Sequence, residues 1–345
     1  MIFTGCRPAP WKPRPRGREG TVGDPPRRGP PARSSAPTRA TDHDFPRSGF
    51  GTPTPDFGGR AALANPGTNQ PMQRSAPFLI IGHHRSGTNF LGELLQRNAA
   101  VACANEPFSM HTDFFRDNDL RPWSSAEYDQ AVLHPELYSS PKIVLFLQEL
   151  RKWLNSSPEG CRRGFKETLL YEKLPWLGEF LPGLRVIHLV RDPRAVAASV
   201  LNVPEAEELW KYSVTVTRYL EEELGHPPGD GLDPFELCLR SIDIRWGLAR
   251  QSLAAFEHIT VRLEDVVEHP EDTLGPLMKF LDLEPTSEQM DFIADSQRES
   301  RGGRYSSYRS RDSVLNSWRS RLTDAQQTRL ATGLRSFFEE YDYAS

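Results

Sequence analysis

The sequence lacks the long apolar run that a membrane-spanning helix requires. No stretch among its 345 residues approaches the about 18–20 consecutive apolar residues of such a helix. Cysteine is also scarce, and Cys6, Cys103, Cys161 and Cys238 lie far apart without a CxxC pair. This spacing predicts no disulfide framework and no zinc site, and it is typical of a reducing compartment. We therefore expect a cytoplasmic protein without a membrane span and without a metal centre.

Acidic residues are rare in the first 77 positions. That segment has only 5 of the 46 Asp and Glu residues, but 12 of the 42 Lys and Arg residues and 15 of the 30 prolines. A segment this rich in proline and poor in apolar residues cannot bury enough apolar surface to offset the entropy lost on ordering. We therefore predict that residues 1–77 are disordered and that residues 78–345 form one folded domain. In that domain the remaining 41 acidic residues outnumber the remaining 30 basic ones, which argues against nucleic acid as a partner.

Strand and helix patterns alternate after Pro77. The apolar run 78–81 predicts a buried parallel strand, and a helical pattern follows from Asn89 to Arg97. The same order recurs with a strand at 185–190 and a helix at 193–201 that has Asp192 as its N-cap. Further elements are predicted as helices over 205–224, 234–256, 271–281 and 324–341 and a strand over 259–262. This alternation predicts an α/β fold, a P-loop-like three-layer sandwich with a mostly parallel sheet flanked by helices.

A glycine-rich turn joins the first predicted strand to its helix. The segment GHHRSGTN spans Gly82 to Asn89, and its two glycines are five residues apart, as in a P-loop. The residue after Gly87 is Thr88, where a P-loop has the lysine that reaches a nucleotide's β- and γ-phosphates. Backbone N–H groups, the helix N-terminus and Arg85 together predict a site for a phosphate-like anion. The alternative is an ordinary tight turn with a hydroxyl cap.

A second candidate anion site follows the strand at 185–190. Arg191 lies at the carboxyl end of this predicted strand, where open α/β sheets bind their ligands, and Ser199 lies on the helix that follows. A guanidinium and a hydroxyl would hold a second phosphate, separate from the first. Alternatively, Arg191 pairs with an acidic side chain and Ser199 is a small packing residue.

These two segments carry a resemblance to a known family. The stretch IIGHHRSGTNFLGELL resembles the 5′-phosphosulfate-binding segment of the sulfotransferases that use 3′-phosphoadenosine-5′-phosphosulfate (PAPS). The stretch VIHLVRDPRAVAASVL is similar to their 3′-phosphate-binding segment, in the form common among carbohydrate and tyrosylprotein members. A third stretch, VRLEDVVEHPEDTLGPLMKFLDLE, is similar to a later family segment but has Leu263 where an aromatic residue is usual.

The resemblance implies transfer of a sulfuryl group from PAPS, as co-substrate, to an acceptor hydroxyl or amine. It implies that Arg191 and Ser199 hold the 3′-phosphate of PAPS. The residues that would hold the 5′-phosphosulfate follow one another along the glycine-rich turn: Arg85, Ser86, Gly87, Thr88 and Asn89. The mechanism requires no metal ion.

The chemistry needs a base for the acceptor's proton and a cation for the leaving oxygen. Glu106 is the first candidate for the base, since it follows the next predicted strand and lies 21 residues after Arg85, as the catalytic glutamate does in tyrosylprotein sulfotransferases. Lys166 is the candidate cation, placed before the Arg191 strand as a lysine is in related families. Glu106 as a surface or capping residue, and Lys166 paired with Glu167, are the alternatives. The rival bases are His83 and His84, followed by His111 and Glu167.

Several points stay open at the level of sequence. The stretch 304–309 and Trp318 either fold over the nucleotide or form a solvated loop. Segments 109–158 and 205–225 are expected to wall the acceptor side, and the acceptor is a carbohydrate, a peptide or a small phenol, with a slight preference for carbohydrate. A P-loop kinase or nucleotide hydrolase, and a non-catalytic nucleotide-binding module, are the alternative functions. The oligomeric state is open.

Overall fold

A computed structural model describes residues 76–108, 141–168, 170–202, 220, 225, 233–298 and 306–344. Apart from its last two residues, the segment 1–77 lies outside the described residues, so its predicted disorder stays a prediction. His111, most of the helix predicted over 205–224 and much of the expected acceptor wall also lie outside them.

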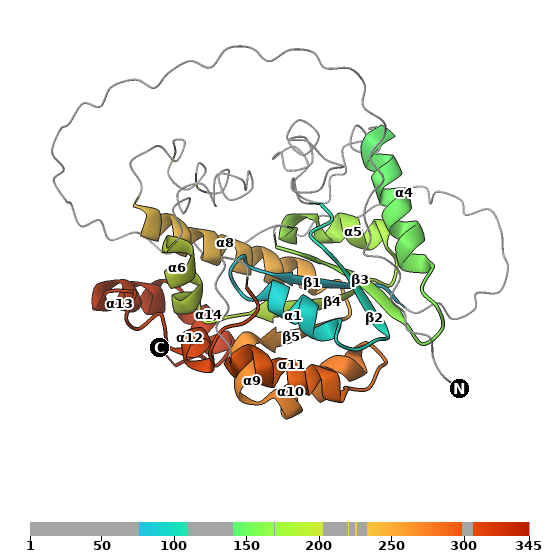
Figure 1. The fold of residues 1–345 in the computed structure, drawn as a ribbon. Coiled ribbons are helices and arrows are strands. Elements are labelled where there is room, and N and C mark those ends of the chain that lie inside the picture. Colours follow the sequence, from blue (N-terminus) through green and yellow to red (C-terminus); the bar gives the residue numbers. More distant parts are fainter. Residues whose placement is uncertain are drawn as a thin grey trace, which may run out of the picture. The chain divides into compact units, whose positions relative to one another are not determined.

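Five parallel strands form the sheet at the centre of the described domain. The strands lie in the order β2-β3-β1-β4-β5, and each pairs in parallel with its neighbours (Figure 1). Their bounds are Phe78–Gly82 (β1), Val101–Asn105 (β2), Arg162–Glu167 (β3), Arg185–Val190 (β4) and His258–Arg262 (β5). All five therefore end at the same edge of the sheet, where the loops after β1, β2, β3 and β4 meet.

The central strand β1 is buried on both faces. Successive side chains of a strand point to opposite sides, so Leu79 and Ile81 enter one hydrophobic cluster while Phe78 and Ile80 enter another. A strand covered on both sides needs a continuous apolar run rather than alternation, as the sequence FLII has. Each cluster lies between the sheet and a layer of helices that covers one of its faces, so the predicted α/β three-layer sandwich is confirmed.

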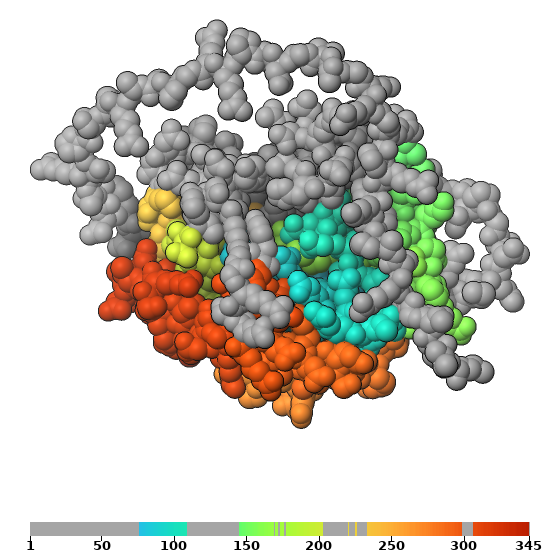
Figure 2. All heavy atoms as spheres, in the orientation of Figure 1, coloured from blue at the N-terminus to red at the C-terminus, as the bar shows by residue number. Residues whose placement is uncertain are grey.

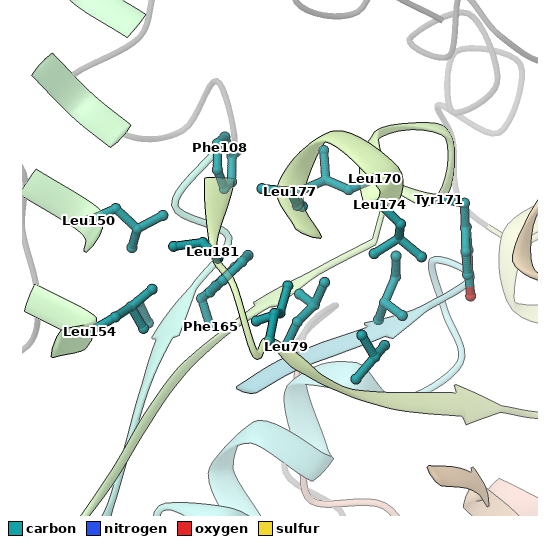
Figure 3. Packing of buried hydrophobic residues seen from close by; sticks show 14 of the residues in the cluster. Leu79, Phe108, Leu150, Leu154, Phe165, Leu170, Tyr171, Leu174, Leu177 and Leu181 are labelled. Carbon is teal, nitrogen blue, oxygen red and sulfur yellow. The ribbon is translucent and has the colours of Figure 1, made fainter. Parts of the chain in front are cut away.

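The first face of the sheet is covered by helices that contribute mainly leucine and phenylalanine. These helices are α4 (Pro141–Asn155), the 3-10 helix η2 (Tyr171–Lys173), α5 (Leu174–Phe180) and the end of α8 (Pro234–Leu253). Figure 3 shows Leu79 and Phe165 of the sheet among leucines from α4 and α5, with Phe108 at the border of the cluster. Phe108 therefore ties the chain that follows β2 into this core.

The opposite face is covered by the helix after β1 and by a C-terminal group of helices. They are α1 (Thr88–Leu95), α9 (Leu263–Glu268), α10 (Pro270–Phe280) and α11 (Ser287–Arg298). Figure 2 shows the orange C-terminal spheres against the cyan spheres of the α1 segment. Phe90 of α1 stacks on Phe292 of α11, with ring centroids 5.6 Å apart.

A third apolar cluster lies beside the end of β4. It contains α6 (Pro193–Leu201), the start of α8, α13 (Asp324–Gly333) and α14 (Arg335–Glu340), and α12 (Arg311–Leu315) precedes α13 in the chain. One continuous helix over 324–341 is predicted, but the structure has two, with a break at Leu334. Glycine has low helix propensity, and Gly333 at the end of α13 accounts for the break.

The described cysteines are in two states. Cys103 and Cys238 are free thiols, whereas Cys161 is disulfide-bonded. A single bonded cysteine tests neither the predicted absence of a disulfide framework nor the compartment, so the cytoplasmic location stays a prediction. None of the helices in the described ranges is long and apolar enough to cross a membrane.

Candidate functional site

The glycine-rich turn is fixed by its backbone conformation and by a close neighbour. Gly87 has a φ of 92°, and Arg85 has a φ of 69°, which is unusual for a residue with a side chain. A Cβ atom on Gly87 would lie 2.9 Å from Cδ2 of Leu263. Leu263, at the position where the resembled family usually has an aromatic residue, is thus buried against the turn and in close contact with its glycine.

The turn presents an uncapped helix N-terminus. Gly87 is the N-cap of α1 and has no side chain to cap it, and the first turn of α1 has no acidic residue. The first N–H groups of a helix lack partners within the helix, so they attract anions when no side chain caps them. Ser86 and Thr88 are buried beside these groups. This arrangement fits the predicted phosphate-like anion better than a turn capped by a hydroxyl.

The two histidines of the turn are held as neutral donors and acceptors. Nδ1 of His83 lies 2.8 Å from the carbonyl oxygen of His84, to which it can only donate. Nη1 of Arg245, on α8, lies 2.7 Å from Nδ1 of His84 and 3.4 Å from Nε2 of His83, and a guanidinium only donates. The accepting nitrogen of each ring is therefore already occupied.

Electrostatics agrees with this assignment. Burial, with the Arg245 charge second, lowers the pKa of His83 to about 3. Burial also holds the pKa of His84 well below its usual value, helped by His83 and Arg245. A ring whose basic nitrogen faces a buried guanidinium is a poor proton acceptor. The geometry thus disfavours both rival histidine bases.

The two predicted anion segments lie side by side. Nη1 of Arg191 donates to the carbonyl oxygen of Arg85 at 2.9 Å, and its Nη2 donates to the carbonyl of Val314 at 2.9 Å. Ser199 accepts a hydrogen bond from Nε of Arg85 at 3.0 Å. Ser199 is therefore bonded to the arginine of the first segment, whereas the sequence suggested a clamp with Arg191. The segments share contacts at a single edge of the sheet.

The loop that carries Arg191 has a rigid support. The Asp192 carboxylate caps α6 by accepting the N–H of Arg194 at 2.8 Å, and it also pairs with the Arg194 guanidinium at 2.7 Å. That guanidinium lies over the ring of Trp318, 4.1 Å from its centroid. Trp318 is buried in the third apolar cluster, so it is a core residue and not part of a solvated loop, and its contact with a nucleotide stays untested.

A third arginine approaches from the C-terminal part of the chain. The charge of Arg309 is among the influences that lower the pKa of Arg191, of which burial is the largest. Arg304 and Tyr305 of the same stretch lie outside the described residues. The charges of Glu264 and Asp192 oppose this effect and act on Arg191 more strongly than that of Arg309. Nε of Arg191 is buried with no hydrogen-bond partner within the described part of the chain, which fits a bound anion.

Glu106 and Lys166 form an ion pair at the same edge of the sheet. Nζ of Lys166 lies 2.6 Å from Oε1 of Glu106, and the N–H of Glu106 donates to the carbonyl of Lys166 at 2.8 Å. The Lys166 side chain is 2% exposed and that of Glu106 is 29% exposed, so the pair has one buried and one accessible member. The structure brings both predicted catalytic residues together, and Lys166 is not paired with Glu167 as the alternative supposed.

Register places this pair near the anion site. β3 lies between β2 and β1, and Ile80 of β1 is opposite Lys166, which is opposite Asn105 of β2. Neighbouring strands are about 4.8 Å apart, so the ends of β2 and β1 are roughly 10 Å apart. An anion bound at the turn would therefore lie near Lys166. Within the described ranges, no group of three or more His, Cys, Asp or Glu side chains is arranged to hold a metal ion.

Glu167 has a larger part in the site than its sequence context indicated. Its carboxyl is buried, and Oε1 accepts the N–H of Phe108 at 2.7 Å. Burial, and next the charge of Glu106, raise the pKa of Glu167 to about 8. The sequence feature that could have indicated this role is the adjacent pair Lys166-Glu167, in which two opposite charges lie side by side inside a strand.

One protein family matches most of the described domain. A family model described as the sulfotransferase family matches residues 77–288. No curated protein sequence matches the chain. Among solved structures, a sulfotransferase domain from the curacin biosynthetic pathway is 15% identical, with a TM-score of 0.45, and the match covers 75% of this chain and 97% of that one.

Two further structures give similar values. A mouse sulfotransferase complexed with PAP is 16% identical, with a TM-score of 0.45, and the match covers 78% of this chain and 86% of that one. A sulfotransferase from Mycobacterium avium is 14% identical, with a TM-score of 0.41, over 79% of this chain and 78% of that one. The family match spans more than half of the chain and includes both anion segments. The chain belongs to the sulfotransferase family.

Proposed function

We propose that this protein transfers a sulfuryl group from PAPS to a hydroxyl or amine acceptor. The observation that carries the proposal is the Glu106–Lys166 ion pair at the sheet edge that also holds the uncapped turn and three arginines. One edge thus offers a proton acceptor, a buried cation and sites for two anionic groups. PAPS has an anionic group at each end of an adenosine, which matches this distribution.

The binding roles follow from the contacts. The turn with Arg85, Ser86, Gly87, Thr88 and Asn89 would hold the 5′-phosphosulfate, since its backbone N–H groups are uncapped. Arg191 with Ser199 would hold the 3′-phosphate, and we add Arg309 to this group because its charge acts on Arg191.

The chemical roles follow from exposure and charge. The accessible carboxylate of Glu106 takes the proton of the acceptor hydroxyl as the acceptor oxygen forms its bond to sulfur. The bond from sulfur to the bridging oxygen breaks, and the phosphate leaves with that electron pair. Lys166 stabilises the charge on this leaving oxygen from its buried position. Proton and charge are thus handled by two side chains that are already paired.

The chemical class of the acceptor is a separate prediction. The RDPRA form of the second segment, residues 191–195, favours a carbohydrate. A peptide or a small phenol is the alternative, and a screen with radiolabelled donor against these three classes distinguishes them.

Thermal unfolding with nucleotides tests the donor. PAP is the desulfated product of PAPS. At 100 times its Kd it should stabilise the protein by about 2.7 kcal/mol and raise its Tm, whereas ATP with Mg²⁺ should not. A Tm shift with ATP and Mg²⁺ alone would replace the proposal with a kinase or hydrolase. Binding of PAP without transfer to any acceptor would instead indicate a binding module.

Two substitutions test the chemistry. Glu106→Gln keeps the shape of the side chain but removes the proton acceptor, and Lys166→Ala removes the cation, so each should lower kcat by about 10²-fold or more. PAP binding, measured by the Tm shift, should persist in Glu106→Gln. Arg335→Ala, which removes an exposed i,i+4 ion pair remote from the site, serves as the control and should keep full activity. Full activity in both site variants would refute the assignment.

A further inference from the structure

The backbone of Glu106 has a conformation that its sequence does not favour. Its φ is 42°, in the left-handed region, although it is neither glycine nor an asparagine-like residue. Pro107 follows directly, and it restricts the backbone of the preceding residue. Such a conformation persists only where the surroundings impose it. The side-chain direction of Glu106 therefore depends on what holds residues 106–108.

Two adjacent residues of β3 hold this segment from both sides. The carbonyl of Lys166 accepts the N–H of Glu106, and the Lys166 ammonium binds its carboxylate at 2.6 Å. The carboxyl of Glu167 accepts the N–H of Phe108 at 2.7 Å and also a backbone hydrogen bond from Thr168. Successive side chains of a strand point to opposite faces. Lys166 therefore holds the side chain of Glu106, while Glu167 holds the backbone two residues later.

The far end of the segment is anchored in the core. Phe108 is 6% exposed, and its ring centroid lies 4.9 Å from that of Phe146 and 5.9 Å from that of Phe165. Packing fixes the ring of Phe108, and the Glu167 hydrogen bond fixes its N–H. Together they leave the turn at Glu106 little freedom to rotate.

We propose that Glu167 is a positioning residue, which holds the backbone after β2 so that the Glu106 carboxylate faces the acceptor and Lys166. This inference rests on the proposed function, because it assigns Glu106 the role of base. Glu167 itself does not touch the reacting atoms. Its contribution is the accepted N–H of Phe108.

The charge state of Glu167 adds a second consequence. Burial and the charge of Glu106 raise its pKa to about 8, against the lowering effect of Lys166 and two backbone N–H groups. Below about pH 8 it is thus an uncharged acceptor beside the Glu106–Lys166 pair. Above about pH 8 it ionises and adds a negative charge near Lys166, which opposes the approach of an anionic donor.

Paired substitutions separate positioning from a general structural role. Glu167→Ala removes the acceptor, and we expect kcat to fall about tenfold or more with the Kd for PAP changed less than about twofold. Glu167→Gln keeps a carbonyl oxygen that accepts the Phe108 N–H, so it should recover most of the lost kcat at about pH 7. Its kcat/KM should also lack the decrease near about pH 8 that we expect of the unsubstituted protein, because ionised Glu167 would oppose the approach of an anionic donor.

The outcomes are distinct. If the unsubstituted protein transfers no sulfuryl group to any acceptor, the proposed function fails. If it is active and Glu167→Ala keeps full kcat, or if Glu167→Gln is as impaired as Glu167→Ala, the positioning role is overturned. If Glu167→Ala does not fold, Glu167→Gln decides by its kcat at about pH 7: near-full kcat supports the role of the accepted Phe108 N–H, and a fall of about tenfold or more with an unchanged Kd for PAP refutes it.

Discussion

Backbone strain in the described chain falls on two side chains of the site. Four non-glycine residues have a positive φ, and two of them, Asp282 and Asp342, are of a type that tolerates it. The other two are Arg85 and Glu106, the arginine of the anion turn and the proposed base. Left-handed residues with a Cβ cost about 1–2 kcal/mol each, so the fold maintains both against a local preference.

The substitution Gly87→Ala tests the anion turn at this scale. An alanine there would be strained at a φ of 92°, and its Cβ would lie 2.9 Å from Leu263. We expect a loss of about 2 kcal/mol or more in the free energy of unfolding, measured by urea denaturation, and much weaker PAP binding.

Gly160→Ala is the matched control. Gly160 has a φ of 75°, and a Cβ added there would have no neighbouring atom within 4 Å, so this variant has the backbone strain without the contact. It should lose about 1 kcal/mol and bind PAP normally. The double variant Gly87→Ala/Leu263→Ala should recover part of the PAP affinity, and equal effects of Gly87→Ala and Gly160→Ala would refute the role of Leu263.

At the scale of elements, the two helices at the site begin differently. α1 begins at an uncapped glycine, whereas α6 is capped by Asp192, whose carboxylate accepts the N–H of Arg194. An anion therefore suits the start of α1, while α6 has its own internal carboxylate there. The difference supports the proposal that the turn holds the phosphosulfate and that Arg191 acts through its side chain.

Removing the α6 cap should affect ligand binding as well as stability. Asp192→Ala loses the cap and the buried ion pair with Arg194, and we expect a loss of about 2 kcal/mol together with a lower affinity for PAP, because Arg191 is the preceding residue. Chemical denaturation and calorimetric titration measure the two effects. Thr323→Ala removes the capping box of α13 and should lose about 1 kcal/mol with no change in affinity. If Asp192→Ala and Thr323→Ala bound PAP with equal affinity, the proposed link between the α6 cap and PAP binding would be contradicted.

The sequence predicted the strands and helices that flank the two anion segments, but it missed α4, α5 and β3 on the other side of the central strand. The strand over 185–190, the helix over 193–201 and the Asp192 cap are confirmed at their predicted bounds. β3, with the sequence RRGFKE, was missed because four of its six residues are charged, yet it is buried. Its charges are compensated by tertiary partners, such as the carbonyl of Trp153 for Arg163 and the carboxylate of Glu106 for Lys166.

The site was predictable where chemistry follows local sequence. The anion turn could be inferred from its glycines and the strand before it, whereas the bond from Arg85 to Ser199 joins residues 114 positions apart. The Arg245 contact to the histidines is equally nonlocal, so the histidines remained open as bases from the sequence alone. Periodicity cannot reveal which distant polar groups meet in the fold.

For the whole molecule, buried titratable groups predict how stability depends on pH. The pKa values of His83 and His188 are lowered to about 3 by burial, so the folded state resists their protonation, and stability is lost as pH falls below about 6.5. The pKa of Glu167 is raised to about 8, so its contribution is present at low pH and is lost as pH rises from about 4.5 through 8. We expect the highest Tm near about pH 6.5.

His188→Phe tests the acidic side of this profile. Nδ1 of His188 is buried without a hydrogen-bond partner among the described residues, and the ring meets Tyr171 and Tyr341 edge-on. Phenylalanine keeps these ring contacts and cannot be protonated, so Tm should fall less between about pH 7 and pH 4. His269→Asn, at an exposed histidine, should leave the profile unchanged. A profile for His188→Phe that matches the unsubstituted protein would contradict this account.

The place of β3 between β2 and β1 has a consequence for synthesis. β2 pairs with β3 and with no other strand of the described sheet, yet it precedes β3 in the chain by more than 50 residues. A nascent chain emerging from the ribosome therefore holds β1 and β2 before the strand that separates them exists. Glu106 meets Lys166 only when β3 inserts between β1 and β2, so the proposed proton acceptor and the proposed cation come together in one nonlocal pairing.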